Sequence, residues 1–326
     1  MSNKKALIFG IGGQDGSLLA KLLLEKGYEI TGQTRSLKNS NLINLKTLDI
    51  LDHIDVVELN SLEVNFLAKF LERIDPSEIY NLSGQSSVSL SFKLPIETLV
   101  SQLNFVNLIL EAMSKIGSKA KFFNAGSGEC FGDTSHNIAT ETSTFNPSNP
   151  YAVAKCGAFW TVRNYRNYHG INASTGILFN HESALRPSNF VTRKIIKGAT
   201  SIFKGSKEKL HLGNLSAKRD WGIASEYVIA MWEMLQQDKP DDYIISTGTA
   251  RSIEEFVNIA FRVLNLDWRD HVLSDPNLFR PSDALINHGD ASKAKVKLGW
   301  SNTIMLEDVV KHLIEEELKP KQENEL

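Results

Sequence analysis

The sequence is poor in cysteine, with two among 326 residues, and it contains no long hydrophobic run. Two cysteines exclude a disulfide framework as the main source of stability. No apolar stretch approaches the roughly 20 residues that span a bilayer. The opening MSNKK leads directly into a short apolar segment, without the hydrophobic core of a signal peptide. We therefore expect a protein of the reducing cytoplasm that has no membrane segment.

Neither sign of charge is in excess. Lysine and arginine number 36 against 38 aspartates and glutamates, which gives a formal net charge of -2. This balance gives no global reason to expect nucleic acid or a membrane surface as a partner, although local basic clusters can still bind phosphates. The length suits one large or two smaller domains with a sizeable core.

A glycine-rich turn lies near the start of the chain. Residues 6–9 form a short apolar run, residues 10–16 read GIGGQDG, and residues 17–26 have helical character up to Gly27. Glycines between a strand and a helix allow a tight turn and a close approach of backbone to a pyrophosphate, which the helix N-terminus favours. This context favours dinucleotide binding over a mere tight turn. The candidate residues are Gly10, Gly13, Gln14, Asp15 and Gly16.

The expected second strand, residues 28–34, indicates which dinucleotide is bound. It ends in Arg35 and Ser36, where a fold that prefers NAD usually carries an acid for the ribose diol. A guanidinium and a hydroxyl suit a 2′-phosphate, so we expect NADP rather than NAD. An exposed surface arginine is the alternative. A third strand, residues 56–59, leads to Asn60 and Ser61, which are expected beside the adenine.

Strands and helices continue to alternate up to about residue 180. Their order predicts an α/β fold, a Rossmann-type doubly wound parallel sheet with ligands at the carboxyl ends of its strands, followed by a smaller mixed α/β substrate-binding domain. We expect an NADP-binding domain over 1–180 with some crossing back of the chain, a nucleotide-sugar-binding domain mainly over 181–318, and a frayed tail over 319–326. The further expected elements are helices at 64–73, 95–114, 151–168, 223–236 and 253–264, and strands at 78–82, 121–125, 173–179 and 242–247.

Residues suited to proton chemistry follow the strand at 121–125. Ser127 and Glu129 supply a hydroxyl and a possible base, and Tyr151 and Lys155 stand four residues apart. At this spacing both side chains project from one helix face, so the ammonium is expected to lower the pKa of the phenol. The alternatives are a solvated helix that carries an aromatic residue, and for Glu129 a carboxylate that caps backbone amides. Cys130 is expected to be a buried apolar filler, because no histidine partner is evident.

Several longer motifs are more specific than the glycine turn. They are GGQDGS at 12–17, EIYNL at 78–82, YAVAK at 151–155, GILFNHES at 176–183, FVTRK at 190–194, and LGNL and RDWG within 212–222. Together they resemble the nucleotide-sugar branch of the extended short-chain dehydrogenase/reductases, most closely the GDP-mannose 4,6-dehydratase family. The resemblance covers nearly the whole chain.

The resemblance implies a role for each matching residue. Tyr151 becomes the redox acid/base and Lys155 its partner, while Ser127 and Glu129 match the family's Thr-x-Glu pair. It implies oxidation at C4 of the sugar, removal of the C5 proton by Glu129 with loss of the 6-hydroxyl, and hydride return to C6, with NADP regenerated. Leu82 and Gln85 join the cofactor site, and no metal ion is expected. The residues expected to hold the substrate are Ser86, Asn180, Glu182, Lys194, Arg219 and Arg280.

Three departures from the family pattern surround the expected sugar pocket. They are GSGECFG at 126–132, in which Gly128 is expected to open space or loosen the backbone, SGQSS at 83–87 and ALRP at 184–187. They leave open a different hexose, such as GDP-N-acetylglucosamine. Separate alternatives are a nucleotide-sugar epimerase or 4-ketoreductase on the same fold, and a non-catalytic dinucleotide-binding sensor, which would be expected to lack Tyr151, Lys155 or Glu129. The resemblance further implies a homodimer, formed through the helices that begin near Pro95 and Tyr151, or a homotetramer. The loop after Arg35 lacks the family's second Arg and Ser run, which counts against NADP and against the tetramer.

Overall fold

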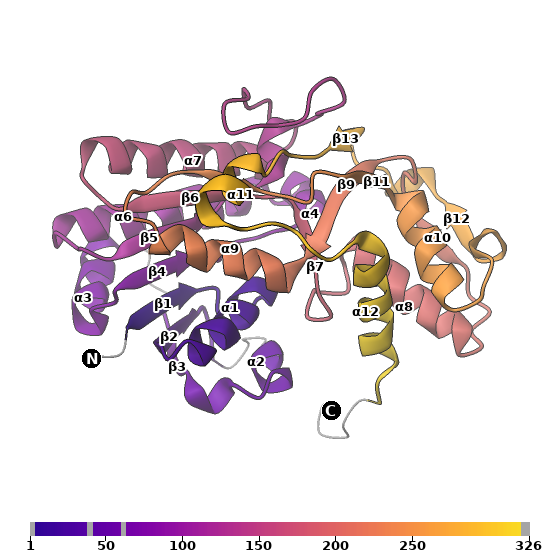
Figure 1. Cartoon of the computed structure of the whole chain (residues 1–326), viewed down its shortest axis with the longest axis horizontal. Coiled ribbons are helices and arrows are strands. Elements are labelled where there is room, and N and C mark those ends of the chain that lie inside the picture. Colours follow the sequence, from indigo (N-terminus) through magenta and orange to yellow (C-terminus); the bar gives the residue numbers. More distant parts are fainter. Residues whose placement is uncertain (1–3, 38–41, 60–62, 321–326) are drawn as a thin grey trace.

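A seven-stranded parallel sheet forms the centre of the larger part of the molecule in a computed structural model that describes residues 4–37, 42–59 and 63–320 (Figure 1). The strand order is β10-β6-β5-β4-β1-β2-β3. The strand order reverses at β1, so the crevice beside its carboxyl end is where ligands bind in such sheets. The strands are β1 (Lys5–Phe9), β2 (Glu29–Thr34), β3 (Asp55–Glu58), β4 (Glu78–Asn81), β5 (Lys121–Ala125), β6 (Ala173–Leu178) and β10 (Tyr243–Ile245).

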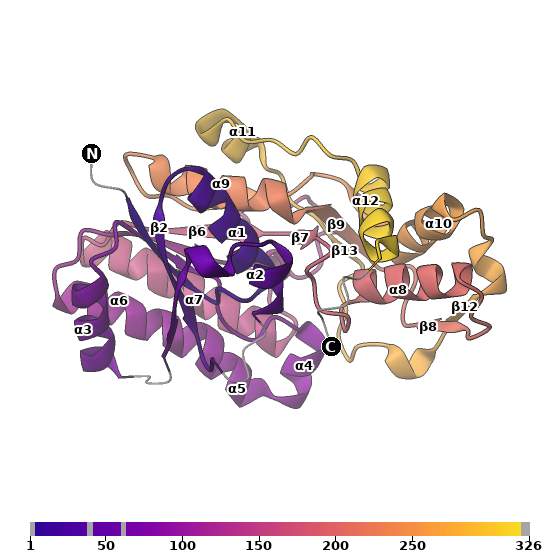
Figure 2. The same cartoon turned by 90° about the horizontal axis from the view of Figure 1, so that it is seen from below.

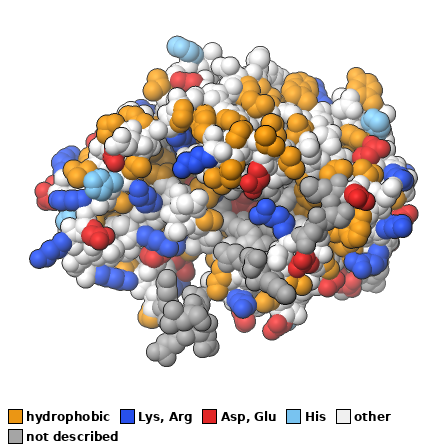
Figure 3. Space-filling view, turned by 180° about the vertical axis from the view of Figure 1, so that it is seen from behind, with side chains coloured by type: hydrophobic (Ala, Val, Ile, Leu, Met, Phe, Trp, Pro, Cys, Tyr) orange, Lys and Arg blue, Asp and Glu red, His pale blue; other side chains and the backbone are white. Residues whose placement is uncertain are grey.

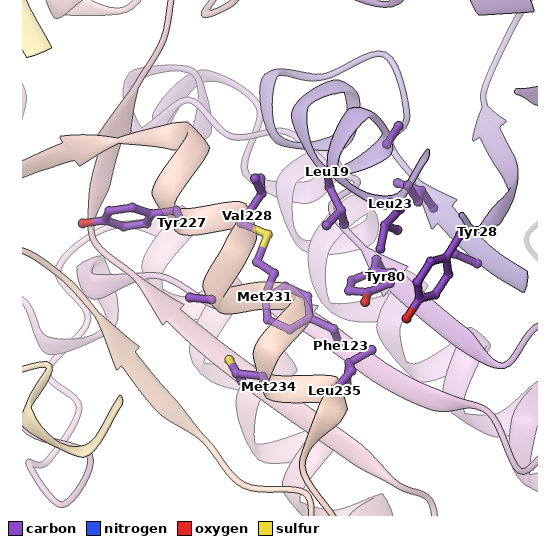
Figure 4. Close-up of a cluster of buried hydrophobic side chains, with 14 of the residues drawn as sticks. Leu19, Leu23, Tyr28, Tyr80, Phe123, Tyr227, Val228, Met231, Met234 and Leu235 are labelled. Carbon is purple, nitrogen blue, oxygen red and sulfur yellow. The ribbon is translucent and has the colours of Figure 1, made fainter. Parts of the chain in front are cut away.

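Helices cover both faces of this sheet (Figure 2). On one face, α1 (Gln14–Glu25) packs against α9 (Ala224–Gln236), and Figure 4 shows Leu19 and Leu23 of α1 directed toward Val228 and Met231 of α9. On the other face lie α3 (Val64–Ile74), α6 (Phe105–Lys115) and α7 (Pro150–Tyr168). Since both faces are covered, the strands are apolar on both sides, as Leu7, Ile8 and Phe9 in β1 illustrate by being fully buried.

The expected helix over 95–114 contains an irregular turn. It starts as α5 (Pro95–Leu99), passes through a π-helical turn at Val100–Asn104, and continues as α6. Within this turn, Gln102 donates a hydrogen bond of 2.7 Å to the backbone oxygen of Gln85. Such turns recur at functional sites, and here Val100, Ser101 and Phe105 line a cavity of about 1740 Å³.

A second, smaller group of elements follows β6. Its core lies between the helices α8 (Val191–Phe203), α10 (Ile253–Val263) and α12 (Leu306–Leu318). Its strands are β7 (Asn180–Glu182), β9 (Lys218–Ile223), β11 (Ala250–Ser252) and β13 (Ile286–Asn287) in one sheet, and β8 (Leu210–Leu212) with β12 (Val272–Ser274) in another. The remaining helices are α2 (Ile43–Thr47), α4 (Val88–Lys93) and α11 (Ser292–Leu298), and single 3-10 turns occur at Leu51–His53, Gly128–Phe131, Trp268–Asp270 and Pro276–Leu278.

The doubly wound parallel sheet confirms the fold class predicted from the sequence. The clearest boundary error is at α1, which begins at Gln14 rather than at residue 17, because the glycine turn itself supplies the first helical turn. The proposed division at residue 180 stays a prediction, although β10 and α9, from beyond that point, complete the large sheet and its cover.

Asn60, Ser61 and the tail from 321 onward lie outside the described residues. Among the helices that the structure describes, none has the length and apolar character needed to cross a membrane.

Candidate active site

Two adjoining cavities open at the carboxyl ends of the sheet strands. The larger, of about 1740 Å³, runs along the glycine turn to Arg35 and Ser36 at the end of β2. The smaller, of about 630 Å³, contains Ser127, Glu129, Tyr151 and Lys155. The two share the glycine turn and Arg186. Figure 3 shows charged side chains of both signs scattered over one face of the molecule, so no single-sign field covers that face.

The glycine turn has the geometry of a phosphate cradle. Gly10 has a φ of +84°, and a Cβ there would lie 2.8 Å from the backbone of Leu82. A Cβ on Gly16 would lie 2.3 Å from the Gly10 oxygen, so α1 can approach β1 only because this residue is glycine. Gly13 occupies the N-cap of α1 and no side chain caps the helix. The first backbone N–H groups of α1 therefore suit an anionic ligand, as a dinucleotide pyrophosphate would require.

Asp15 is held by protein groups. Its carboxylate lies 3.0 Å from His181 Nε2 and accepts a hydrogen bond of 2.9 Å from Gln14. Burial acts to raise the pKa of Asp15, but the attraction and hydrogen bonds of His181 outweigh it and lower the pKa to about 2. The other ring nitrogen of His181 lies 2.7 Å from the Phe179 carbonyl oxygen. Both partners of the ring are acceptors, and Asp15 raises the pKa of His181 against the effect of burial.

The residues after β5 form one short 3-10 turn. Ser127 caps it, its hydroxyl accepting a hydrogen bond of 3.2 Å from the backbone N–H of Glu129. Glu129 is half-buried and accepts a hydrogen bond of 3.0 Å from Asn149. Asn287 secures the same turn from β13, because its amide donates to the carbonyl oxygens of Gly128 and Gly132 at 3.0 and 2.9 Å. The turn therefore presents Glu129 to the smaller cavity on a rigid support.

Tyr151 and Lys155 lie on the first turns of α7, with the lysine Nζ 5.7 Å from the centre of the tyrosine ring. Lys155 also donates a hydrogen bond of 2.7 Å to the Ala125 oxygen. The expected lowering of the phenol pKa is not found. Burial raises the pKa of Tyr151 well above its ordinary value, against an opposing hydrogen bond with Ser127, and it lowers the pKa of Lys155 to about 8. Desolvation of both groups outweighs their mutual influence.

Among the expected cofactor residues that the structure describes, Gln85 alone lines neither cavity. Its side-chain amide donates to the Ser87 carbonyl oxygen at 2.9 Å and to the Thr98 hydroxyl at 3.1 Å. The side chain thus ties its own loop to α5, a use that its position in the sequence does not reveal. Leu82 lines both cavities.

All six residues expected to hold the substrate line the smaller cavity, but their partners differ. Arg219 is buried and pairs with Asp283, which also lies 3.4 Å from Arg280. Lys194 is exposed and donates a hydrogen bond of 2.6 Å to the His211 carbonyl oxygen. The other three are Ser86, Asn180 and Glu182.

Glu182 is almost fully buried. It accepts a hydrogen bond of 2.6 Å from Thr192 at the start of α8 and pairs with Arg186 at 3.2 Å. Both partners belong to the protein, so this carboxylate anchors α8 beside the cavity.

Sequence reasoning did not single out Asn149, His181, Arg186 or Asp283 as site residues. His181 lies in the family motif at 176–183, and Arg186 lies in the departure from the family pattern at 184–187. These two segments could therefore have indicated both residues. The pairing of His181 with Asp15 joins residues 166 positions apart, and the pairing of Arg219 with Asp283 joins residues 64 positions apart. Contacts at such separations follow from tertiary packing and leave no local pattern in the sequence.

This fold occurs in solved structures of enzymes that act on nucleotide sugars. UDP-glucose 4-epimerase from Thermotoga maritima superposes with a TM-score of 0.84 at 20% identity, covering 95% of this chain and 97% of that one. dTDP-glucose 4,6-dehydratase from Streptomyces venezuelae, a structure with NAD and TYD bound, gives 0.84 at 19% identity, covering 95% and 96%. At these identities the likeness establishes the fold, which is that of the extended short-chain dehydrogenase/reductases.

The sequence comparisons identify the family. The family model described as GDP-mannose 4,6 dehydratase matches residues 7–313. GDP-mannose 4,6 dehydratase 1 of Arabidopsis thaliana is 43% identical over 97% of this chain and 90% of its own length. GDP-mannose 4,6 dehydratase of Homo sapiens is 38% identical over 95% of this chain and 90% of its own. The chain belongs to the GDP-mannose 4,6-dehydratase family, as the sequence motifs indicated.

Proposed function

We propose that this protein is a nicotinamide dinucleotide-dependent lyase that converts GDP-mannose to GDP-4-keto-6-deoxymannose. The observation that carries the proposal is the placement of Glu129 in the same cavity as Tyr151 and Lys155. A redox pair alone serves an epimerase or a ketoreductase, whereas a carboxylate beside it can also remove a carbon-bound proton and expel water. The names of the relatives in the family support the same reaction.

The cofactor is proposed to lie along the larger cavity, with its pyrophosphate at the uncapped start of α1. Arg35 and Ser36 line the far end of that cavity, and a guanidinium there suits the 2′-phosphate of NADP. When bound, the dinucleotide supplies the hydride acceptor for C4 and the hydride donor for C6. Leu82, beneath the glycine turn, lies where the two cavities meet.

The protein groups divide the proton transfers between them. Tyr151 accepts the proton of the C4 hydroxyl, helped by the hydroxyl of Ser127, with which its phenol is hydrogen-bonded. Because burial keeps the pKa of Tyr151 high, its ionisation is proposed to accompany binding of the substrate and the cofactor. Lys155, whose pKa is lowered to about 8, is still mostly cationic at neutral pH and stabilises the phenolate.

Glu129 performs the step that distinguishes a dehydratase. A ketone at C4 acidifies the proton on C5, and the carboxylate takes this proton, directly or through a water molecule. The protonated carboxyl then gives its proton to the 6-hydroxyl, which leaves as water, so one group serves as base and afterwards as acid. When a hydride returns to C6, C5 regains a proton, and the proton that Tyr151 took from the C4 hydroxyl balances it. Asn180, Lys194, Arg219 and Arg280 are proposed to hold the nucleotide diphosphate during this cycle, since they line the same cavity and three of them are cationic.

The surroundings of Gly128 give no support to a hexose with a larger C2 substituent. Gly128 was expected to open space beside Glu129, but a Cβ built there would lie 2.7 Å from the ring of Phe179. The aromatic ring already fills the volume that a larger side chain would occupy. The glycine therefore accommodates Phe179 rather than opening space beside Glu129.

The self-association expected from the family is proposed to use α5 and α7. These neighbouring helices carry apolar side chains that are exposed in the single chain, with 76% of Ile96, 49% of Val153 and 56% of Trp160 accessible. A second copy of this chain would cover them. A homotetramer needs contacts beyond these helices.

The test is to incubate the purified protein with GDP-mannose and, in parallel, with GDP-N-acetylglucosamine, and to search by mass spectrometry for products lighter by one water. Loss of water from GDP-mannose without added reductant is expected. Loss only from the acetamido sugar would reassign the substrate. A product of unchanged mass with an inverted centre, or one formed only with net cofactor turnover, would indicate an epimerase or a ketoreductase instead.

A further inference from the structure

Asn149 connects the two halves of the proposed catalytic machinery. It occupies the N-cap of α7, where its side-chain oxygen accepts a hydrogen bond of 2.8 Å from the backbone N–H of Ala152. Its side-chain nitrogen donates a hydrogen bond of 3.0 Å to Glu129 Oε2. The residue is 5% exposed, so little solvent competes for these contacts. One amide thus joins the carboxylate to the helix that carries Tyr151 and Lys155.

The orientation of this amide follows from its partners. A backbone N–H can only donate, so the group that faces Ala152 must be the oxygen. The amide nitrogen is thereby directed to the other side, where Glu129 supplies an acceptor. Flipping the amide would set N–H against N–H at the cap and oxygen against oxygen at the carboxylate. Both contacts therefore hold the side chain in one state.

This contact makes the two carboxylate oxygens of Glu129 different. Oε2 is engaged by Asn149, whereas Oε1 has no hydrogen-bond partner within 4–37, 42–59 and 63–320. Glu129 lines the smaller cavity, so the unengaged oxygen remains available to a ligand there. A general base must reach its proton within hydrogen-bond distance, and a displacement of about 1 Å can cost a hundredfold in rate.

We propose that Asn149 is a positioning residue that fixes Glu129 relative to Tyr151 and leaves Oε1 to take the C5 proton of the sugar. This inference rests on the proposed function. Asn149 touches neither reacting atom in this role. It acts by tying the base to the helix that carries the redox pair, so that oxidation at C4 and proton removal at C5 occur in one fixed geometry.

The competing explanation is that Asn149 serves only as a helix cap. Serine and aspartate cap helices about as well as asparagine, so Asn149→Ser and Asn149→Asp keep the cap. Serine is too short to reach Glu129 while capping. Aspartate keeps the length but places a second carboxylate beside the first. The two variants therefore alter the contact with Glu129 and spare the cap.

The experiment compares wild type, both variants and Ser252→Ala. Ser252 caps α10 and lines neither cavity, so its replacement removes a cap away from Glu129. For Asn149→Ser we expect kcat for water loss to fall about tenfold or more, a KM close to wild type, and accumulation of reduced cofactor absorbing near 340 nm. Reduced cofactor accumulates because oxidation at C4 continues while elimination is slowed. Ser252→Ala should lower the unfolding temperature without this signal.

The pH profile gives a second readout. Two neighbouring carboxylates resist ionising together, so the acid limb of kcat should move to higher pH by about one unit in Asn149→Asp. Wild-type kinetics and an unshifted acid limb in both variants would overturn the positioning role and leave a cap alone. A wild-type protein that releases no water from GDP-mannose would instead overturn the proposed function, and the positioning role with it.

Discussion

The two ends of the central sheet carry the same kinds of side chain, but these side chains differ in how many protein hydrogen bonds they make. At the amino end, Glu78 begins β4, is 2% exposed, and accepts hydrogen bonds from Tyr28, Tyr80 and Gln236 at 3.0, 2.7 and 3.2 Å. At the carboxyl end, Glu129 follows β5 and, within the described chain, accepts a side-chain hydrogen bond from Asn149 alone. A carboxylate whose oxygens are both hydrogen-bonded by protein groups stabilises the fold, whereas one with an unengaged oxygen is available to react with a ligand.

The tyrosines show the same contrast. Burial raises the pKa of both Tyr80 and Tyr151. Tyr80 donates its hydroxyl proton to Glu78 and lies under α9, where Figure 4 shows it among the packed side chains. Tyr151 faces the smaller cavity. Stability is therefore concentrated at one end of the strands and reactivity at the other, and five substitutions test this separation.

Replacement of the carboxylate at the reactive end should have the largest effect. We expect Glu129→Gln to lower kcat for water loss by about a thousandfold, because the amide cannot take the C5 proton. Folding and cofactor binding should remain, since the amide can keep a contact with Asn149. Steady-state kinetics and thermal unfolding measure the two properties. Turnover like that of wild type would contradict the role of Glu129.

The same substitution at the amino end of the sheet, Glu78→Gln, should lower stability and leave kcat nearly unchanged. Glu78→Gln places an NH₂ group among hydroxyl and amide donors, and we expect it to lower the free energy of unfolding by about 2–3 kcal/mol. At 25 °C, kcat should stay within about twofold of wild type, because Glu78 lies at the opposite end of β4 from the cavities. Urea unfolding and kinetics on one preparation provide the comparison. A large loss of kcat in a folded protein would show that the two ends are coupled.

One chemical change made at both tyrosines sharpens the comparison. Tyr80→Phe removes one donor to a buried carboxylate and should cost about 1–2 kcal/mol of stability with kcat unchanged. Tyr151→Phe should lower kcat about a hundredfold with little effect on stability, since the lost hydroxyl faces a cavity. Because the two variants lose the same atom, equal effects on stability and kcat would show that position in the sheet does not separate the roles.

Local patterns predicted much of this arrangement. The spacing of Tyr151 and Lys155 placed both on one helix, and the run before Gly10 placed the glycine turn at the end of a strand. The sequence could not show that Gln85 hydrogen-bonds its own loop or that the Asp15 carboxylate pairs with His181. The partners of a buried polar group are set by which elements pack together, and that information is absent from a local motif.

Lys155 provides the smallest but most diagnostic effect, because here function opposes stability. Burial lowers its pKa from 10.5 to about 8, so between these values the unfolded chain binds more protons and folding stability rises with pH. At pH 7 the buried charge costs about 3 kcal/mol by this linkage. Replacement of Lys155 removes this cost but also removes the hydrogen bond to the Ala125 oxygen, which offsets part of the gain. Lys155→Met should therefore raise the free energy of unfolding by about 1 kcal/mol at pH 7 while abolishing turnover. Because wild type gains about 2 kcal/mol between pH 7 and pH 10, this advantage should reverse, and wild type should be the more stable protein at pH 10. Urea unfolding at both pH values measures this. A variant less stable than wild type at pH 7 would show that Lys155 belongs, like Glu78, to the structural part of the molecule.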